Sequence, residues 1–269
     1  MRVMQKNKFK PAEQIRYILG PYTGTALYPA AIDCFLRSNR ISAADPVTRL
    51  QWRAGAWPGY LQIDTASGRV LKSPKVYYNY LIPFFVTQTS LQSMDFANEF
   101  ADVAVGDAWN PKFEEEAKKG AGGQSVVAVR SEEMLRIVEQ MRTEGALALT
   151  EENSTKAGDM HGHMLDFKKR GGYLRNRWRR LTGRPAPDYG YKPAEIPLIR
   201  VLVEVVISFL FACGRLRLSR WILSHIPESA IGPFFDALRK KWKSLSRPTK
   251  RKGLKNFQIV KTKKRCRKN

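Results

Sequence analysis

Hydrophobic and polar residues follow two periods along the first 150 positions, and each period predicts one type of element. Short apolar or alternating runs predict strands, whereas apolar residues three or four positions apart predict helices. The predicted strands are residues 47–52, 60–64, 70–72, 103–105, 125–130 and 146–149. The predicted helices are residues 30–40 and 132–143, with weaker signals at 11–17 and 111–123, the latter being a charged loop or a short helix.

Local signals support parts of this assignment. Thr65–Gly68 lies between two predicted strands and is typical of a hairpin loop. Ser131 precedes the helix at 132–143, and its hydroxyl can accept a hydrogen bond from an amide that the helix start leaves unpaired. The strand–helix–strand order over 125–149 favours an α/β layer. We therefore predict an α/β (α+β) fold with a mixed sheet flanked by helices.

The pattern after residue 166 is helical. Four apolar residues recur at helical spacings between 167 and 181, with basic residues on the other faces. This predicts a cationic amphipathic helix, or a helix packed on the domain with its Lys and Arg stems along the surface. Residues 182–193 are rich in Pro and Gly and indicate a linker. The apolar residues are Phe167, Leu174, Trp178 and Leu181.

A long apolar segment follows the linker. Pro197–Cys213 is interrupted only by Arg200 and Glu204, and it is shorter than the roughly 20 apolar residues of a membrane span. We expect a buried or membrane-surface helix there, more helix at 216–225 and 233–245, and disorder from Lys250. The predicted organisation is an α/β domain at 1–184, a helical appendage at 185–249 and a basic tail at 250–269.

The formal net charge of +23 is confined to two blocks. Residues 168–184 contain eight basic residues and residues 237–269 contain fifteen, with no acid in either, so the rest of the chain is neutral. Such blocks bind polyanions or anionic membrane surfaces, or remain as solvated tails. Nucleic acid is the less favoured partner because no nucleic-acid-binding motif is present and few aromatic residues interleave with the charges.

The spacing of the cysteines indicates the redox state of the cellular compartment. Cys34, Cys213 and Cys266 are widely spaced, which argues against a disulfide framework and for a reducing environment. The basic amino-terminal residues are not followed by the apolar region of a signal peptide. We predict a cytoplasmic protein, with peripheral attachment to a membrane as the alternative.

The stretch from Ser90 to Trp109 carries the strongest candidate chemistry. Its polar residues at 95, 98, 99 and 102 would share one face of a helix. The apolar strand Val103–Val105 then ends at Gly106–Asp107, and a strand with Gly-Asp at its carboxyl end can bring backbone against a ligand. The alternative is a solvated helix followed by a core strand.

These residues and two further segments resemble the coenzyme F420 hydrogenase/dehydrogenase beta-subunit family, in its carboxyl-terminal domain. That family reads Cys-x-x-Cys-x-Asp, Asn-Glu, Ala-Asp, a short apolar strand and Gly-Asp, which resembles 90–107 here. Trp52–Gly59 is similar to its Arg-x-Gly-x-Trp-Pro-Gly turn, and Met160–Gly171 is similar to its distal motif. The resemblance covers roughly Leu19 to Leu181.

The resemblance implies an oxidoreductase or electron-transfer subunit that binds FAD and coenzyme F420 and works with a redox partner subunit. It does not name a catalytic acid or base. Arg53 could pair with a phosphate or a carboxylate, and the other matched positions could bring backbone or an aromatic face close to a ring. Each could instead define a turn. The implied cofactor-binding residues are Arg53, Gly55, Trp57, Gly59, Gly106 and Asp107.

The chain also departs from the family pattern. The paired cysteines correspond to Ser90 and Ser93, and the expected Cys-Gly-Pro reads Leu19-Gly20-Pro21. Iron–sulfur clusters need cysteine thiolates, so we predict none. The chain begins near the middle of the family, which suggests a truncated relative, a partner-dependent fragment or a short gene product. The alternative function is therefore a non-catalytic scaffold that binds a partner or an anionic membrane through its basic helices.

His161-Gly162-His163 raises the question of a metal site. On a strand, both imidazoles would point to the same side, and the glycine argues against a regular helix. A zinc site needs a third or fourth protein ligand that this segment does not specify. We predict no metal site.

Overall fold

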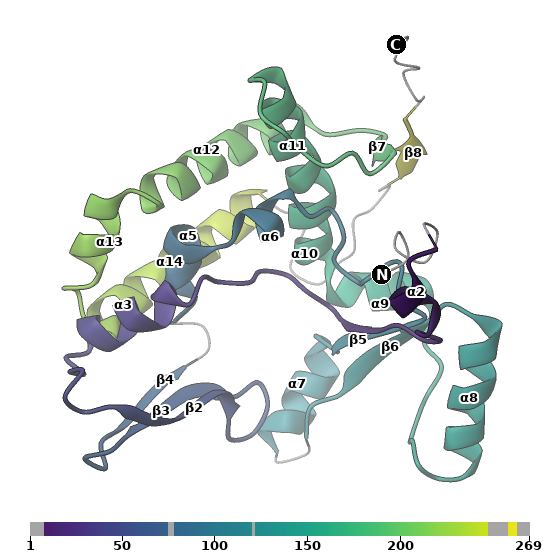
Figure 1. The fold of residues 1–269 in the computed structure, drawn as a ribbon, viewed down its shortest axis with the longest axis horizontal. Helices are drawn as coiled ribbons and strands as arrows, with labels where there is room; N and C mark the ends of the chain where they lie inside the picture. The colour runs from purple at the N-terminus through teal and green to yellow at the C-terminus, as the bar shows by residue number, and fades with distance from the viewer. Residues whose placement is uncertain (1–7, 75–77, 120–121, 247–257, 263–269) are drawn as a thin grey trace.

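The computed structural model describes residues 8–74, 78–119, 122–246 and 258–262 (Figure 1). In chain order the elements are α2 (Lys10–Glu13), β1 (Leu19–Pro21), α3 (Ala30–Ser38), β2 (Val47–Ala54), β3 (Tyr60–Thr65), β4 (Val70–Pro74), the 3-10 turn η1 (Asn79–Leu81), α5 (Ile82–Phe85), α6 (Gln88–Gln92), β5 (Val103–Asp107), α7 (Pro111–Lys118), β6 (Ser125–Val129), α8 (Glu132–Thr143), α9 (Ser154–Met160), α10 (Gly162–Asp166), the π-helical turn η2 (Phe167–Gly171), α11 (Gly172–Leu181), β7 (Tyr191–Pro193), α12 (Leu198–Gly214), α13 (Arg217–Leu223), α14 (Glu228–Ser246) and β8 (Ile259–Lys261).

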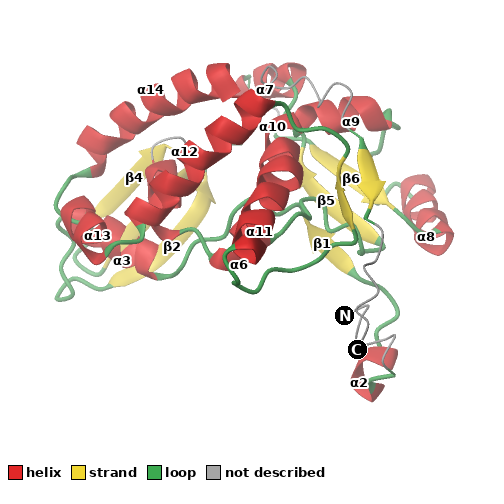
Figure 2. Cartoon of the chain, turned by 90° about the horizontal axis from the view of Figure 1, so that it is seen from above, coloured by secondary structure: helices red, strands yellow, loops and turns green. Residues whose placement is uncertain are grey.

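The strands form three small sheets. A mixed sheet has the order β1-β5-β6, with β1 parallel to β5 and β5 antiparallel to β6. An antiparallel sheet has the order β2-β3-β4, and β7 pairs with β8. Seen from above, α10 and α11 stand between the antiparallel and the mixed sheet (Figure 2). The predicted class, a mixed sheet flanked by helices with a helical carboxyl-terminal region, is confirmed.

The main core lies between the antiparallel sheet and the helices that cover it. Strand β3 buries every second residue, as a strand with one face on a core does. Leu223 of α13 is buried in the same core, and Ile231 and Phe235 of α14 pack against it. The helices after residue 184 therefore share a core with earlier elements, and the division at 184/185 stays a prediction. The other buried members are Ala31, Cys34, Phe35, Leu61, Ile63, Tyr78, Tyr80, Leu81 and Phe85.

The predicted helix over residues 95–102 is wrong. This segment is irregular, and Asn98 has a positive φ of 49° that ends any helix there. Its polar side chains bind backbone instead of facing solvent: Asp95 accepts from the amide of Glu99 at 3.1 Å, and Asp102 accepts from the amide of Ile18 at 2.9 Å. Side chains that bind backbone in this way compete with helix formation.

The predicted strand at 146–149 is also wrong, because these residues have no regular structure. The mixed sheet obtains its parallel strand from β1, which is not among the predicted strands. Strand β1 has three residues, Leu-Gly-Pro, and it exists through its pairing with β5, where Leu19 lies opposite Val103. Of the predicted helix at 11–17, the structure has only the four residues of α2.

Other elements agree with the sequence. Helix α3, the β3–β4 hairpin, β5, β6 and α8 lie within two residues of their predicted bounds, and α7 is a helix. The Ser131 hydroxyl accepts the Met134 amide, as predicted for the cap of α8. In the basic tail, Ile259–Lys261 forms β8 rather than disorder, whereas 250–257 and 263–269 lie outside the described residues. No described helix is long and apolar enough to cross a membrane.

Candidate functional site

The matched segments meet where the end of β2 approaches the end of β5. The Arg53 guanidinium on β2 donates to Asp107 Oδ2 on β5 at 2.7 Å and to the Pro58 carbonyl at 2.9 Å. These bonds use two of its five N–H donors. The ion pair joins residues 54 positions apart and links the antiparallel sheet to the mixed sheet. With 40% of its side chain exposed, Arg53 is open to an anionic group.

Two tryptophans pack beside this ion pair. The rings of Trp57 and Trp109 lie 4.7 Å apart between centroids, with an interplanar angle of 44°, and both residues are half-buried. Gly123 makes room for them, because a Cβ there would come within 2.4 Å of the Trp57 ring. The Trp57 Nε1–H is buried and has no hydrogen-bond partner among the described residues. The pair thus offers partly exposed ring surface and a donor that no described group satisfies.

Gly55 and Gly59 shape the turn that carries Trp57. Their φ angles are 74° and 77°, a left-handed conformation that side chains rarely adopt. A Cβ at Gly55 would also lie 2.6 Å from the Tyr60 ring. These two predicted site residues position the turn, whereas the side chain of Arg53 contacts Asp107 and that of Trp57 contacts Trp109.

Gly106 lies against a cluster of three rings. A Cβ on Gly106 would lie 2.5 Å from the Tyr22 ring. The ring that lies against this glycine therefore belongs to the protein and not to a cofactor. The centroids of Tyr22, Phe96 and His161 are 5.1–5.2 Å from one another. Sequence reasoning did not select Tyr22 or Phe96. The sequence feature that could have pointed to Tyr22 is its position directly after Gly20-Pro21. Its approach to Gly106, however, depends on the pairing of β1 with β5.

His161 is buried in this cluster, with 4% of its surface exposed. Burial lowers its pKa from 6.5 to about 4, and the nearby Asp107 charge opposes this only in part. Its Nε2 has no hydrogen-bond partner among the described residues. The imidazole is therefore neutral at pH 7.

The indication that Gly162 prevents a regular helix here is wrong, because α10 begins at this residue. His161 lies at the junction of α9 and α10, and His163 lies within α10. In the part of the chain that the structure describes, no group of three or more His, Cys, Asp or Glu side chains could hold a metal ion. The distal motif thus contributes a buried aromatic contact to the candidate site.

Ser90 and Ser93, which the resemblance places at the family's paired cysteines, do not fit an iron–sulfur cluster. Ser90 Oγ accepts from the Ala26 amide at 2.8 Å and from the Thr87 hydroxyl at 3.0 Å. The Ser93 hydroxyl donates to the Asp95 carbonyl at 3.0 Å. Both hydroxyls are engaged, and neither supplies the thiolate that a cluster requires.

Three polar side chains close the end of helix α6 at the same place. Lys168 Nζ donates to the Ser90 carbonyl at 2.9 Å, Arg175 Nε to Leu91 at 2.7 Å and Asn176 Nδ2 to Gln92 at 2.8 Å. Carbonyls at the end of a helix lack partners within the helix, so these bonds satisfy them. Burial and, to a lesser extent, the neighbouring Arg175 charge together lower the pKa of Lys168 to about 8. The expectation that the basic residues of 168–181 lie on exposed faces is wrong for Lys168, Lys169 and Arg175, which are buried.

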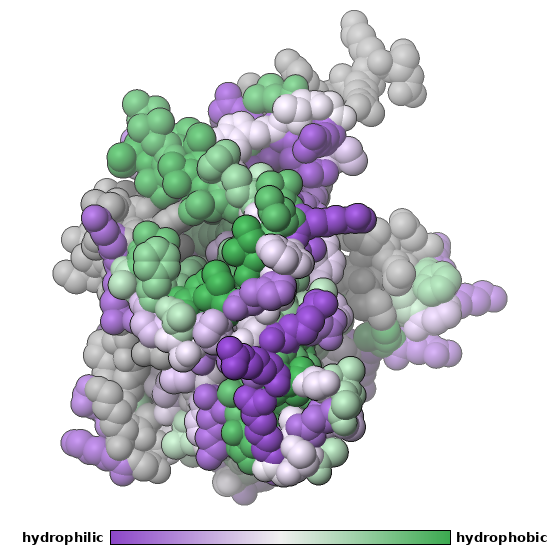
Figure 3. Space-filling view, turned by 90° about the vertical axis from the view of Figure 1, so that its left-hand side faces the viewer, coloured by the Kyte–Doolittle hydropathy of each residue, from purple (hydrophilic) through white to green (hydrophobic). Residues whose placement is uncertain are grey.

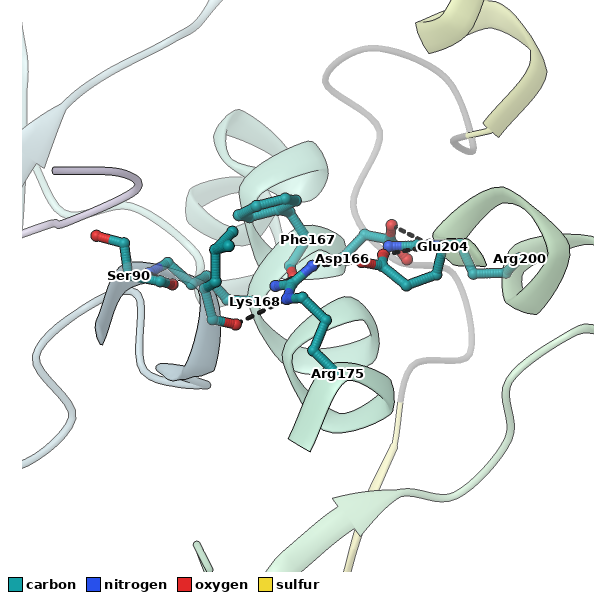
Figure 4. Close-up of polar contacts among 8 residues, drawn as sticks. Ser90, Asp166, Phe167, Lys168, Arg175, Arg200 and Glu204 are labelled. Carbon is teal, nitrogen blue, oxygen red and sulfur yellow. Dashed lines mark hydrogen bonds and ion pairs between the residues drawn. The ribbon is translucent and has the colours of Figure 1, made fainter. Parts of the chain in front are cut away.

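A buried charge network fastens α12 to this region. Arg175 pairs with Glu204 at 2.5 Å, Arg200 with Glu204 at 2.8 Å, and Arg200 with Asp166 at 2.6 Å. Figure 4 shows Ser90 on one side of the α10–α11 helix and the α12 residues on the other. Burial lowers the pKa of Arg175, while Glu204 partly offsets this. All four side chains are at most 7% exposed, so the network joins helices and is closed to solvent.

Comparison with known proteins identifies the family. The family model for the C terminus of the beta subunit of coenzyme F420 hydrogenase/dehydrogenase matches residues 1–155, more than half of the chain. The chain belongs to this family. The match includes the Arg53–Gly59 turn and the Gly106–Asp107 strand end, whereas the 160–171 motif lies beyond it.

Other comparisons are more distant. A search of curated proteins found no match. Among solved structures, a chain of the F420-reducing NiFe hydrogenase complex from Methanosarcina barkeri is similar, with 11% sequence identity and a TM-score of 0.42. The similarity covers 70% of this chain and 62% of that chain. The family assignment rests on the family model.

Proposed function

We propose that the chain is a flavin- and coenzyme F420-linked redox subunit, and that its cofactor site is the Arg53–Asp107 and Trp57–Trp109 cluster. The observation that carries this proposal is the convergence of two family motifs on one partly exposed surface. Arg53 on β2 pairs with Asp107 on β5, and Trp57, in the turn that follows β2, packs against Trp109, which follows β5. Family membership supplies the class of cofactor.

The residues present fit a flavin or deazaflavin in three respects. The tryptophan pair offers an aromatic face for a flat ring. The Arg53 guanidinium, steadied by Asp107 and Pro58, can bind a phosphate or carboxylate through its remaining donors. The Trp57 Nε1–H can donate to a ring oxygen or nitrogen.

When bound, a flavin and a deazaflavin supply the hydride transfer chemistry. This chain's residues place and hold the rings. Gly106 and Tyr22 form the floor of the site. The ring of Tyr22 fits there because Gly106 has no Cβ. His161 stays neutral beneath them and so adds no positive charge beside Asp107.

A titration of the purified full chain with FAD tests the proposal. We expect a structured flavin absorption band, and tight binding that falls at least about tenfold in Gly106→Ala, because the new Cβ displaces Tyr22. The control is Gly122→Ala, where a Cβ meets nothing within 4 Å. The same titration with Trp57→Leu should show a loss of similar size.

A second candidate function is a scaffold that lacks redox activity. The observation in its favour is the engaged pair of Ser90 and Ser93 hydroxyls at the family's cluster position. A colourless protein that binds no added FAD, with native circular dichroism, would favour the scaffold and overturn the redox proposal.

The proposal extends to a partner subunit and to the cellular location of the protein. Because the family is named for a beta subunit, we infer that the chain works with a redox partner subunit. The widely spaced cysteines support a cytoplasmic location. Co-purification of a tagged full chain from its own cells, followed by visible spectroscopy of the complex, tests the partner, and fractionation of the same cells tests the location.

A further inference from the structure

Helix α12 has its charges inside and its apolar side chains outside, the reverse of an ordinary surface helix. One stripe, at helical spacing, is buried against the body and contains both charged residues of the helix. Arg200 and Glu204 on this stripe form the ion pairs with α10 and α11. The residues of the buried stripe are Arg200, Glu204, Ile207, Phe211 and Gly214.

The opposite stripe of α12 is exposed and entirely apolar. Its residues also follow the helical period, so they form one continuous face about 18 Å long. Phe209 is 66% exposed and Leu202 is 54% exposed, values unusual for such large apolar side chains. The face consists of Leu198, Ile199, Leu202, Val205, Val206, Phe209 and Leu210.

Helices α13 and α14 extend the apolar surface. Figure 3, drawn from the side of the molecule where α12 and α13 lie, shows hydrophobic side chains gathered on the upper part of the surface, with hydrophilic ones along its edge. The exposed apolar residues of these two helices are Leu216, Leu218, Trp221 and Ile222 on α13 and Phe234 and Leu238 on α14. We call this set together with the α12 stripe the apolar face.

The exposed charges of α12 and α13 are all positive, and on α14 the largely buried Asp236 is paired with Lys240 at 2.8 Å. Between Leu198 and Ile226 the single carboxylate is Glu204, which is buried and paired. Arg217 lies between two exposed leucines on α13, and Lys240 and Lys241 are exposed near the end of α14. Over α12 and α13 the surface therefore combines a broad apolar area with cations and without exposed anions.

We infer that the apolar face docks in the plane of an anionic membrane surface. Interfacial binding needs apolar area and attraction to anionic lipids together, and both are present here. A headgroup layer supplies negative charge along the whole edge, which complements the cations beside the apolar face. Trp221 suits the boundary between water and acyl chains. Since no described helix could cross a membrane, α12 would lie flat on the surface.

This inference does not depend on the proposed redox function. It also differs from attachment through the basic helix at 168–181, because Lys168, Lys169 and Arg175 are buried there and cannot reach lipid. The basic residues after 246 add to the attraction through composition alone.

Co-sedimentation with vesicles tests the inference. The full chain should sediment with vesicles of phosphatidylcholine and phosphatidylglycerol at low salt, and much less with phosphatidylcholine alone or at high salt. The double variant Leu202→Asp/Phe209→Asp should lower the partition coefficient at least about tenfold. Lys240→Glu/Lys241→Glu should weaken binding at low salt and bring it closer to that at high salt.

The matched control is Leu135→Asp. Leu135 is 50% exposed on α8, at the other end of the molecule from α13 in Figure 1, so the change should leave sedimentation as in the wild type. Circular dichroism and thermal midpoints show whether each variant is folded. The inference is overturned if the wild type does not sediment at low salt, or if the double variant sediments equally. A dimer that the double variant disrupts, without vesicle binding, would assign the face to a second copy.

Discussion

The Arg53–Asp107 pair and the network around Glu204 contain the same chemical groups in opposite surroundings. The side chains of the first pair are 40% and 34% exposed, whereas those of Arg175, Glu204, Arg200 and Asp166 are 7%, 0%, 5% and 1% exposed. A buried charge that loses its partner has no water to replace it, while an exposed one does. The network therefore holds helices together, and the exposed pair can take a ligand.

The largest effect should come from breaking the buried network. Glu204→Leu leaves Arg175 and Arg200 buried without their shared carboxylate, and we expect a loss of about 3–5 kcal/mol in the free energy of unfolding. Urea denaturation measures it. The control Glu139→Leu removes the carboxylate of an exposed pair with Arg142 and should change stability by less than about 1 kcal/mol. Similar losses in both variants would contradict the comparison.

A smaller effect on the free energy of unfolding is expected at acidic pH. The pKa of His161 is about 4 when folded and 6.5 ordinarily, so as the pH falls below 6.5 the unfolded chain takes up this proton first. Stability from this group is fully present above pH 6.5 and is lost as the pH falls to about 4, by at most about 1.4 kcal/mol per pH unit. His161→Phe should remove that slope from the unfolding free energy measured between these pH values. Parallel curves for the two proteins would contradict the burial of a neutral imidazole.

The smallest effect on stability should come from Arg53→Lys. The change keeps the charge but removes the planar fork, so we expect less than about 1 kcal/mol of lost stability, with FAD binding weakened at least about tenfold. Chemical denaturation and a FAD titration of the same sample measure both. If stability falls as far as in Glu204→Leu and FAD binding is unchanged, Arg53 serves the fold instead of the cofactor.

Periodicity predicted those elements that bury one face and expose the other. Strand β3 is of this kind, and its pattern was visible in the sequence. The bounds of helix α8 were also predicted, but it buries Met134 and Val138, whereas Leu135 and Met141 of its apolar pattern are exposed. Strand β1 was missed because a Leu-Gly-Pro segment has no pattern, and its structure depends on β5. The polar spacing at 95–102 resembled a helix face, but the carboxylate of Asp102 binds a backbone amide from residue 18, a contact that no local pattern contains.

The candidate site was predicted in part through the family motifs. They selected Arg53, Trp57 and Asp107, which the fold brings together, although their roles as cofactor contacts stay a prediction. Tyr22 was not selected, because its approach to Gly106 follows from strand pairing. For α12 the sequence showed Arg200 and Glu204 four positions apart in an apolar run, which is a pattern compatible with an ion pair on one helix face. Their partners on α10 and α11 were not predictable from local sequence.

The contact between Gly171 and the charge network restricts how the sequence can vary. A Cβ at this position would lie 2.7 Å from Glu204 Oε2, 2.9 Å from Arg175 Nη1 and 3.0 Å from Arg200 Nη2. Any side chain at 171 would therefore displace at least one ion-pair partner. We expect the glycine and the charges to be inherited as a unit, so that homologues either keep them all or exchange the charges for apolar residues when the glycine changes. Covariation between position 171 and positions 175, 200 and 204 would be the record of this shared constraint.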